Sequence, residues 1–480
     1  MKTPSALGGG STNAAISALG LTSQQIASFV ITLLAAGFLS AAEYGVYTLA
    51  IVFVEFVVML CYTGYFHFVV NEPGEDGPIL ATMFWIMTGI GTAGGLLLIL
   101  SAGALARVFD APDLAPVLRL FGLLQPFAAM IGWASAAMMR AGAMRRYFLI
   151  LIASNLGGLA AGSIVLVMWQ SLFALVVYRA LRIALGVVLF AMALPQRPRF
   201  EFDRAMAIRA SHYAGGLYGA RFLTFLSTFG TDLILAFLFS TAESGLYRFA
   251  NRLATAAIDI VAQPLRSFAL KSFGGVARAG GDLNSVFAQY LSALLFFMSA
   301  FGATVGVLGH TLVVAFFQPE YLAALGAFYA LTVRATGLAG NMLVEPVFAA
   351  GKNTYVGMYH NLFWTILLLV GIVLVAPYGF ETLAVMQAVL ALCTSCAALW
   401  VMSRWGNVAV TPALRPAAAG LGLVAVYGLV LWLCWQSILT ALGASGLAVG
   451  AGVLVAIGLA APTLFAAYKL KVIDPRLFSD

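Results

Sequence analysis

Fourteen stretches of this 480-residue chain are long and apolar enough to cross a bilayer, and they restrict its fold more than any other feature. About 20 apolar residues in a helix span the hydrocarbon core of a membrane. With 62% hydrophobic and 9% charged residues, a soluble domain could not bury so much apolar surface. We therefore expect an all-α polytopic membrane protein. The predicted spans are 14–38, 45–69, 79–104, 115–138, 147–168, 171–193, 212–240, 244–265, 286–314, 322–347, 354–376, 379–402, 414–438 and 445–468.

The sequence that follows the first span occurs twice. LLAAGFLSAAEYGVYTLA, at 33–50, returns 200 residues later as LILAFLFSTAESGLYRFA, with eight identities in 18 positions and no gap. A second pair, Phe109–Asp113 and Phe316–Glu320, follows at an offset of 207. Because each half holds an even number of helices, both halves enter the membrane in the same sense. The sequence thus predicts two parallel six-helix lobes, 1–193 and 212–403, joined by a cytoplasmic linker at 194–211. The rest, 404–480, would add two lipid-facing transmembrane helices and a cytoplasmic tail.

Loop charges predict the orientation. One set of loops, which includes both termini, carries 17 basic residues, whereas the opposite set carries only Arg107 and Arg119. Cytoplasmic loops are enriched in lysine and arginine, so both termini are expected in the cytoplasm. This bias also accounts for the net charge of +7 without a nucleic-acid partner. The loop 71–77 is predicted to be cytoplasmic although it is acidic. The two longest loops, 194–211 and 266–285, are also predicted to be cytoplasmic. The repeated Glu-x-Gly-x-Tyr motifs fall at periplasmic turns, where we expect them to have a structural role.

Ten charged residues lie inside the predicted spans once Arg119, Glu381 and Arg415, near span ends, are assigned to the loops. A charge at bilayer depth costs about 3 kcal/mol or more, so these side chains should face the protein interior or a water-filled cavity. Six arginines against four acids give the embedded set a net charge of +2. The set comprises Arg179, Arg182, Arg221, Arg248, Arg252 and Arg334, with Glu55, Asp232, Asp259 and Glu345.

Two interpretations of these charges remain open at this point. The guanidinium fork matches phosphate and carboxylate oxygens and does not lose its proton, so the arginines could line a cationic cavity for an anionic substrate. Alternatively, they pair with Glu55, Asp259 and Glu345 and only hold helices together, while Arg248 extends to the periplasmic surface. The histidines and cysteines show no metal-ligand spacing, and Cys393 and Cys396 fit helix packing better than redox chemistry. The sequence shows no nucleophile–base pair, glycine-rich phosphate loop or Walker lysine. We therefore expect neither an enzyme nor an ATP-driven pump.

Several segments together resemble the polysaccharide flippases of the multidrug/oligosaccharidyl-lipid/polysaccharide exporter superfamily. They include the arrangement of six, six and two helices and the turn Ser40-AAEYGVYTL-Ala50. The others are Thr82-MFW-Ile86, Ala106-x-x-Phe109-x-x-Pro112, Met139-RAGAMRR-Tyr147, Pro198-RFEFDRAMAIRAS-His212 and Thr231-DLILAFLFSTAESGLYRFANRL-Ala254. Within that superfamily the chain is similar to the O-antigen and exopolysaccharide flippases, and the resemblance covers its whole length.

This resemblance implies a pair of six-helix lobes that alternate access across a bacterial inner membrane. The implied substrate is an undecaprenyl-diphosphate-linked oligosaccharide, moved to the periplasmic leaflet for surface polysaccharide synthesis. Cavity arginines would hold the diphosphate, first Arg221, Arg252 and Arg334, then Arg179, Arg182 and Arg248. No cofactor is implied. Proton or sodium exchange is expected at Asp232 or Asp259, with Glu55 and Glu345 as further candidates. Membrane lipids and the polymerase of the same pathway are candidate partners.

Three alternatives fit the sequence less well. A multidrug and toxin extrusion-type antiporter of organic cations would expose its substrate to a net positive cavity, which disfavours binding. A major-facilitator carrier would need a basic, glycine-rich loop between its second and third helices, where this chain is acidic. A glycan polymerase or ligase would need a catalytic periplasmic loop, and the predicted periplasmic loops have the length of ordinary connections.

Overall fold

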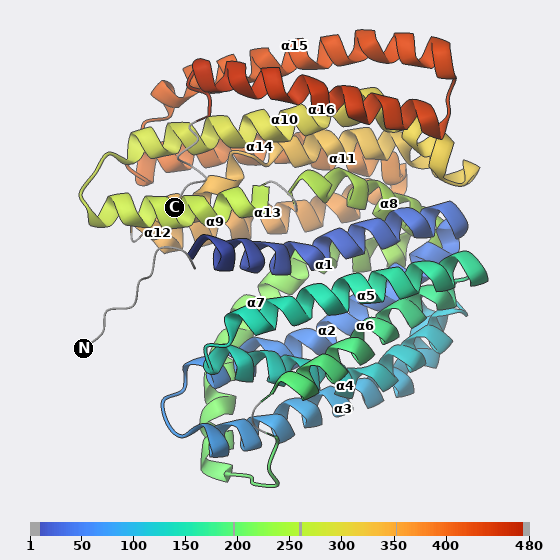
Figure 1. Ribbon diagram of the computed structural model, residues 1–480, viewed down its shortest axis with the longest axis vertical. Helices are drawn as coiled ribbons and strands as arrows, with labels where there is room; N and C mark the ends of the chain where they lie inside the picture. The colour runs from blue at the N-terminus through green and yellow to red at the C-terminus, as the bar shows by residue number, and fades with distance from the viewer. Residues whose placement is uncertain (1–9, 195–196, 259–261, 352, 474–480) are drawn as a thin grey trace. The chain divides into compact units, whose positions relative to one another are not determined.

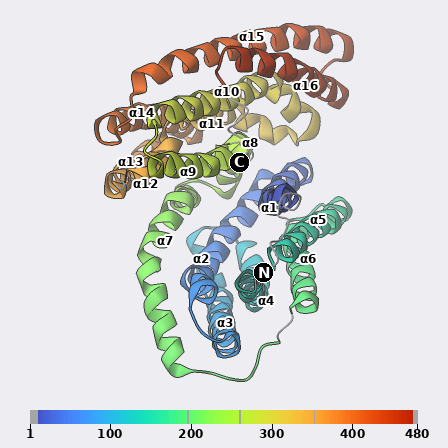
Figure 2. The same ribbon diagram turned by 60° about the vertical axis from the view of Figure 1, so that its left-hand side comes forward.

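The computed structural model describes residues 10–194, 197–258, 262–351 and 353–473, and every regular element among them is a helix (Figure 1). This confirms the expected all-α class. Contacts divide the chain into two compact units, Met1–Arg248 and Phe249–Asp480, so the division falls inside one helix, α8. Figure 2 shows the same helices turned by 60°.

The first unit is a bundle of long helices, which pack both with sequence neighbours and with helices further along the chain. α3 lies against α4, α5 against α6 and α1, and α2 against both α4 and α7. Small residues allow close approach in these contacts, since a β-carbon on Gly95 of α3 would lie 2.3 Å from the Gly122 carbonyl oxygen of α4. The helices are α1 Gly10–Phe38, α2 Ala41–Asn71, α3 Asp76–Val108, α4 Leu114–Arg140, α5 Met144–Trp169, α6 Leu172–Ala193, α7 Arg204–Leu238 and the start of α8 Thr241–Ala257.

The second unit is also helical, and its last two long helices form a pair. α15 packs along α10 and against α16. The other side of α15 carries exposed apolar residues such as Val426 and Leu429, as a lipid-facing surface requires. The elements after α8 are α9 Gln263–Arg278, α10 Leu283–Phe316, η2 Pro319–Ala324, α11 Leu325–Gly337, η3 Asn341–Leu343, α12 Val344–Ala350, α13 Thr354–Val375, η4 Ala376–Tyr378, α14 Phe380–Trp405, α15 Val410–Leu442 and α16 Gly446–Lys469.

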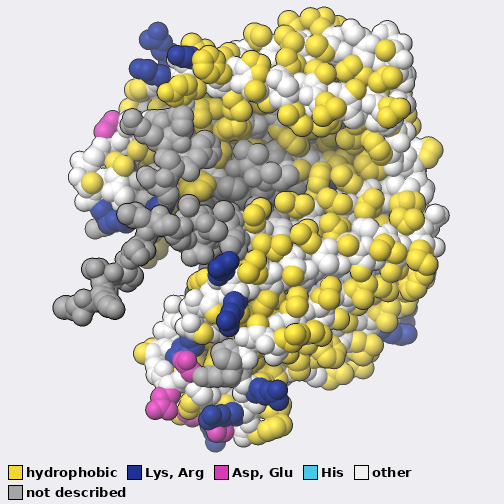
Figure 3. All heavy atoms as spheres, in the orientation of Figure 1, with side chains coloured by type: hydrophobic (Ala, Val, Ile, Leu, Met, Phe, Trp, Pro, Cys, Tyr) yellow, Lys and Arg dark blue, Asp and Glu magenta, His cyan; other side chains and the backbone are white. Residues whose placement is uncertain are grey.

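Ten of the described helices are long and apolar enough to cross a membrane, or eleven if the bent pair Pro319–Gly337 and Asn341–Ala350 forms one span. The protein is therefore a multi-pass membrane protein. A helix occupies each of the other three predicted spans, but α1, α7 and α8 are too polar or too short over their described residues to qualify. The predicted count of 14 thus stays a prediction. Apolar side chains cover most of the face in Figure 3, and charged ones gather towards the ends of the helices.

The two longest predicted loops are partly helical, which corrects the sequence-based boundaries. α7 begins at Arg204 because the Asp203 carboxylate accepts hydrogen bonds from two amides of its first turn. In the other loop, Leu265, Ala269 and Phe273 are buried at a spacing of four, which gives α9 one apolar face. α8 is described from Thr241 to Ala257, and α9 begins at Gln263, still within the predicted span 244–265.

The predicted division into lobes followed the repeat, whereas the contact-based units follow packing. α7 belongs to the first unit because it lies along α2. There the Tyr218 hydroxyl donates a hydrogen bond to the Leu60 carbonyl oxygen, and Gly64 contacts Ala214. The limits 1–193, 194–211, 212–403 and 404–480 therefore remain a prediction about the repeat.

The repeated turn forms the same structure twice. Ser40 caps α2 and Ser240 caps α8, each in a reciprocal pair of hydrogen bonds with the glutamate three residues later. This agrees with the structural role predicted for Glu43 and Glu243. Both turns lie in the first unit, where they contact each other. A β-carbon on Gly45 would lie 2.0 Å from the Thr241 carbonyl oxygen, and one on Gly245 would lie 1.9 Å from that of Ala41. Only glycine permits this approach of two backbones.

The acidic loop between α2 and α3 is held by one arginine. Arg140, the last residue of α4, donates to the Asp76 carboxylate at 2.6 Å and to the carbonyl oxygens of Val69, Glu72 and Gly74. Its side chain is 10% exposed. The Glu72 carboxylate lies 3.7 Å from the Arg209 guanidinium of α7. Basic residues from neighbouring helices thus offset the charge of this loop, which the sequence left unexplained.

We expect the substitution Arg140→Ala to lower the free energy of unfolding by about 2 kcal/mol, since hydrogen bonds to a charged group contribute about 1.5–3 kcal/mol. Proteolytic cleavage within residues 71–77 should become faster. Denaturant titration and limited proteolysis would measure both effects, with Arg145→Ala in the exposed first turn of α5 as the control. Equal stability of the two variants would show that the loop does not depend on Arg140.

Candidate functional site

Arg179 and Glu55 form an ion pair inside the first unit. The Arg179 guanidinium of α6 donates to the Glu55 carboxylate of α2 at 3.0 Å and also lies over the Phe121 ring of α4, 5.8 Å from its centroid. The side chains are 14% and 31% exposed. The pair joins three helices at positions that the sequence places at membrane depth. For these two residues, the contacts are explained by an ion pair that holds neighbouring helices together.

Arg182 lies one turn further along α6 and differs in its partners. Its β-carbon packs against α5, where a β-carbon on Gly158 would lie 2.7 Å away. Among the described residues, no acid lies within ion-pair distance of its guanidinium. Its electrostatic neighbours are Arg179, Tyr178, Tyr47 and, more weakly, Glu55. α6 thus carries two neighbouring guanidinium groups, of which only that of Arg179 pairs with a described carboxylate.

Asp232 and Arg248 form a second pair, at the end of the first unit. The Asp232 carboxylate of α7 lies 3.5 Å from the Arg248 Nε of α8, and their side chains are 18% and 8% exposed. The Arg248 Nε and one Nη are buried without a hydrogen-bond acceptor among the described residues. Arg248 is thus buried beside a carboxylate. One of the two interpretations of the sequence had it extend to the periplasmic surface instead.

Arg334 is held by neutral side chains in the second unit. Its two Nη atoms on α11 donate to the Gln387 amide oxygen of α14 at 2.7 Å and to the Asn251 amide oxygen of α8 at 2.6 Å. Its Nε is buried without an acceptor among the described residues. Amide oxygens orient a guanidinium without cancelling its charge, so Arg334 keeps a full positive charge for a further anion.

Glu345 lies in the first turn of α12, in the second arm of the bent pair, and forms an ion pair with Arg266 of α9. The two side chains are 51% and 39% exposed, so this pair is more accessible than the other two. Partial burial lowers the pKa of the Arg266 guanidinium from its ordinary value. From the sequence, Arg266 was predicted to lie in a cytoplasmic loop, and its pairing with an embedded acid was not predicted.

The remaining predicted residues are placed as follows. Arg221 on α7 has an exposed side chain and makes no hydrogen bond or ion pair with a described residue. Arg252 on α8 is partly buried and has an interaction partner. Asp259 lies outside the described residues. Of the four predicted embedded acids, the three that the structure describes each pair with an arginine. Arg182, Arg221 and Arg334 have no carboxylate partner in the described chain.

Sequence reasoning missed the amides that position Arg334. Asn251 and Gln387 are uncharged, so a search for charges inside apolar spans passes over them. Gln387 is 1% exposed, and a buried polar side chain in a transmembrane helix usually has a hydrogen-bonding partner. A polar residue within an apolar span was therefore the signal that could have found it.

Comparisons with known proteins agree with this fold. The profile of a family described as "Polysaccharide biosynthesis protein" matches residues 34–326. The succinoglycan biosynthesis transport protein ExoT of Rhizobium meliloti (strain 1021) is 25% identical over 250 residues, which cover 51% of this chain and 50% of that protein. The chain thus spans about half the length of this curated relative.

Solved structures show the same fold at low sequence identity. The lipid II flippase MurJ, in an inward closed conformation, has a TM-score of 0.68 at 14% identity and covers 96% of this chain and 98% of its own. An inward-facing multidrug resistance MATE family transporter has a TM-score of 0.66 at 11% identity, with 82% and 98% covered. A mutant of the MATE transporter VcmN of Vibrio cholerae reaches 0.56 at 14% identity, with 82% and 95% covered.

Proposed function

Because the chain belongs to the family of polysaccharide biosynthesis proteins, we propose that it translocates a lipid-linked oligosaccharide across a membrane. The proposed substrate carries its sugars on a polyprenyl diphosphate. The similarity to ExoT, a transport protein of succinoglycan biosynthesis, supports a transporter in preference to an enzyme of sugar assembly. In this proposal the protein moves its substrate without making or breaking a covalent bond.

The observation that carries the proposal is the environment of Arg334. Two neutral amides fix this partly buried guanidinium, and its charge is left for an anionic ligand. A diphosphate presents several oxygens that match the guanidinium geometry. Arg182, Arg221 and Arg252 are proposed as further ligands. Arg179 and Arg248 are proposed to act mainly through their carboxylate partners.

The remaining parts of the proposal concern location and partners. The excess of basic residues in one set of loops supports a bacterial inner membrane protein with both termini in the cytoplasm. Translocation would then run from the cytoplasmic to the periplasmic leaflet. Membrane lipids surround the apolar surface, and the polymerase of the same polysaccharide pathway is the proposed protein partner.

An antiporter of organic cations is the second candidate, since two MATE family transporters share the fold. The charges disfavour it. A cation needs an acid that is free to receive it, whereas Glu55, Asp232 and Glu345 each pair with an arginine. Arg182 and Arg334 have no carboxylate partner among the described residues, so their charge would repel such a substrate.

We further propose that transport is coupled to a proton or sodium ion through Asp232. This carboxylate is 18% exposed and lies beside Arg248, so a change in its charge would alter a contact between α7 and α8. The substitution Asp232→Asn should remove the dependence of transport on an ion gradient while the protein remains folded. Unchanged ion dependence in this variant would exclude Asp232 as the coupling residue.

The experiment that tests the function is transport in proteoliposomes that contain the purified protein. A polyprenyl-diphosphate-linked oligosaccharide would be supplied on one side, and an impermeant probe would report its leaflet. We expect the lipid-linked sugar to cross, an organic cation not to cross, and protein-free vesicles to show neither. Transport of the cation alone, with or without ion gradients, would replace the flippase by the antiporter.

A further inference from the structure

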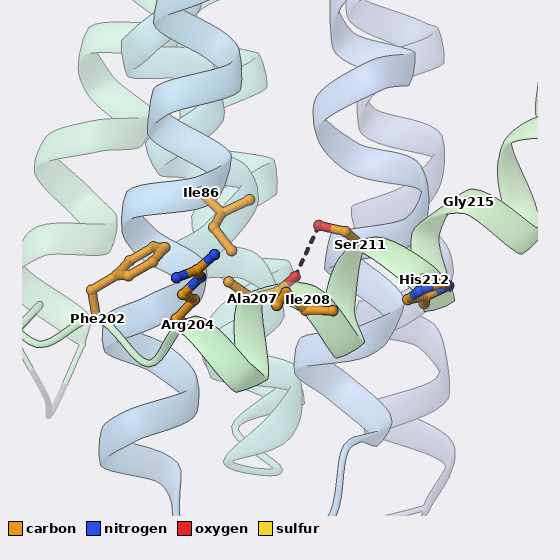
Figure 4. A pocket seen from close by; sticks show the side chains of 8 residues that line it. All are labelled: Ile86, Phe202, Arg204, Ala207, Ile208, Ser211, His212 and Gly215. Carbon is orange, nitrogen blue, oxygen red and sulfur yellow. Dashed lines mark hydrogen bonds between the residues drawn. The ribbon is translucent and has the colours of Figure 1, made fainter.

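A groove lies at the start of α7, apart from the embedded arginines. It has a volume of about 740 Å³ and is formed by α3, by the segment before α7, and by the first three turns of α7 (Figure 4). Its lining is mostly apolar. The lining residues are Ile86, Phe202, Arg204, Ala207, Ile208, Ser211, His212 and Gly215.

The walls of the groove are fixed to each other. The Trp85 indole N–H of α3 donates to the Arg199 carbonyl oxygen at 3.1 Å, and the Asp203 amide donates to the Thr82 hydroxyl at 3.1 Å. The Trp85 ring also contacts the Phe200 ring, with centroids 5.3 Å apart. These contacts hold the segment before α7 against α3, so the groove is a preformed feature of the first unit.

One wall of the groove is a helix that is long and apolar enough to cross a membrane. In this helix, α3, the Thr82 hydroxyl accepts a hydrogen bond from the Asp203 amide just before α7. Ile86 lies one turn further along α3, about 6 Å beyond Thr82. A lipid of the surrounding leaflet could therefore reach the groove along α3.

The charge of the groove is positive because the neighbouring acids already have partners. Asp203 caps α7, Glu72 faces Arg209, and Glu201 lies 4.0 Å from Arg199. Arg204 is exposed and forms no ion pair or hydrogen bond with a described residue. In Figure 4 its guanidinium lies beside Ile86 and Phe202, at one end of the groove.

A single cation beside an apolar channel matches an amphiphile with a negative headgroup. We propose that the groove binds an anionic phospholipid, with its phosphate on Arg204 and an acyl chain along Ile86, Phe202 and Ile208. Phe202 and Ile208 are 59% and 52% exposed, so the chain would cover apolar surface that is otherwise open. Basic pockets between transmembrane helices at a membrane surface bind such headgroups. The site is separate from the proposed substrate ligands and would position the first turn of α7.

Binding to delipidated full-length protein in detergent tests this assignment. Native mass spectrometry would compare phosphatidylglycerol with phosphatidylcholine for the wild type, Arg204→Ala and the groove-filling Ala207→Trp. Arg145→Ala is the matched control, because Arg145 is exposed on α5, next to the α4 end that contacts Asp76. We expect the wild type to prefer phosphatidylglycerol and Arg204→Ala to weaken that lipid about fivefold, the effect of one basic side chain. Ala207→Trp should weaken both lipids, and the control should bind as the wild type does.

A photoactivatable phosphatidylglycerol provides a second measurement that does not depend on variants. Peptide mapping should find its label within residues 83–90 and 199–215. Label confined to other segments, equal affinity for the two lipids, or an equal loss in Arg145→Ala would overturn the proposal. Displacement of phosphatidylglycerol by a polyprenyl diphosphate at equal concentration would also overturn it, since the groove would then be a substrate site.

Discussion

The variant Gly245→Ala is expected to unfold about 3 kcal/mol more easily than the wild type and to lose transport. Its new β-carbon would lie 1.9 Å from the main-chain oxygen of Ala41, a distance that requires the two helix starts to separate. Overpacking of a tight contact costs about 1–3 kcal/mol, and a clash with backbone belongs at the upper end of that range. Detergent-based unfolding and the proteoliposome assay would measure the two effects.

Gly103→Ala is the matched control for this substitution. Gly103 also lies in a helix, but nothing is within 4 Å of a β-carbon at that position. Alanine is favoured over glycine inside a helix by about 0.5–1 kcal/mol, so the control should be slightly more stable and fully active. Gly45→Ala should behave like Gly245→Ala because it meets Thr241 in the same way. If all three variants have wild-type stability, the contact between the two turns is not required.

Arg334→Ala is expected to reduce transport of a diphosphate-linked substrate at least tenfold while leaving the fold intact. A charged hydrogen bond contributes about 1.5–3 kcal/mol, which corresponds to a factor of about 10–100 in binding or rate. The substitution leaves Asn251 and Gln387 without their donor, so a moderate loss of stability should accompany it. Initial rates of translocation at several substrate concentrations would measure the loss.

Two further variants separate a ligand role from a structural one. Arg404→Ala removes an exposed guanidinium from the last turn of α14 in the same unit and should leave transport unchanged. Arg334→Lys keeps the charge but cannot hold both amides as a planar fork does, so partial activity is expected. If Arg334→Ala transports as well as the wild type, the diphosphate must be held by other residues.

Hydropathy and the internal repeat were sufficient to predict the class and the order of the helices. The boundaries of the helices were harder to predict, because a largely polar segment can form a helix that buries only a narrow apolar face. α9 is such a case, since only Leu265, Ala269 and Phe273 mark its buried face within a basic segment. The start of α7 was missed for a similar reason, as the four arginines around it suggested a loop.

The candidate site was predictable in its charges but not in its pairs. Insertion cost identifies residues that must avoid lipid, and Arg179 and Glu55 are indeed joined. Sequence spacing relates residues only along one helix, so it could not show that Glu345 contacts Arg266 or that amides hold Arg334. Contacts between distant helices depend on packing, which no local pattern encodes.

The contact between the two repeated turns has the form of an isologous interface. Gly45 meets the main chain of the second copy, and Gly245 meets that of the first copy, as in a symmetric homodimer. The atoms they meet are backbone oxygens, so no side-chain change at Ala41 or Thr241 can make room for a larger residue. Each copy therefore limits how far the other can diverge, which accounts for the identity that persists around residues 40–47 and 240–247.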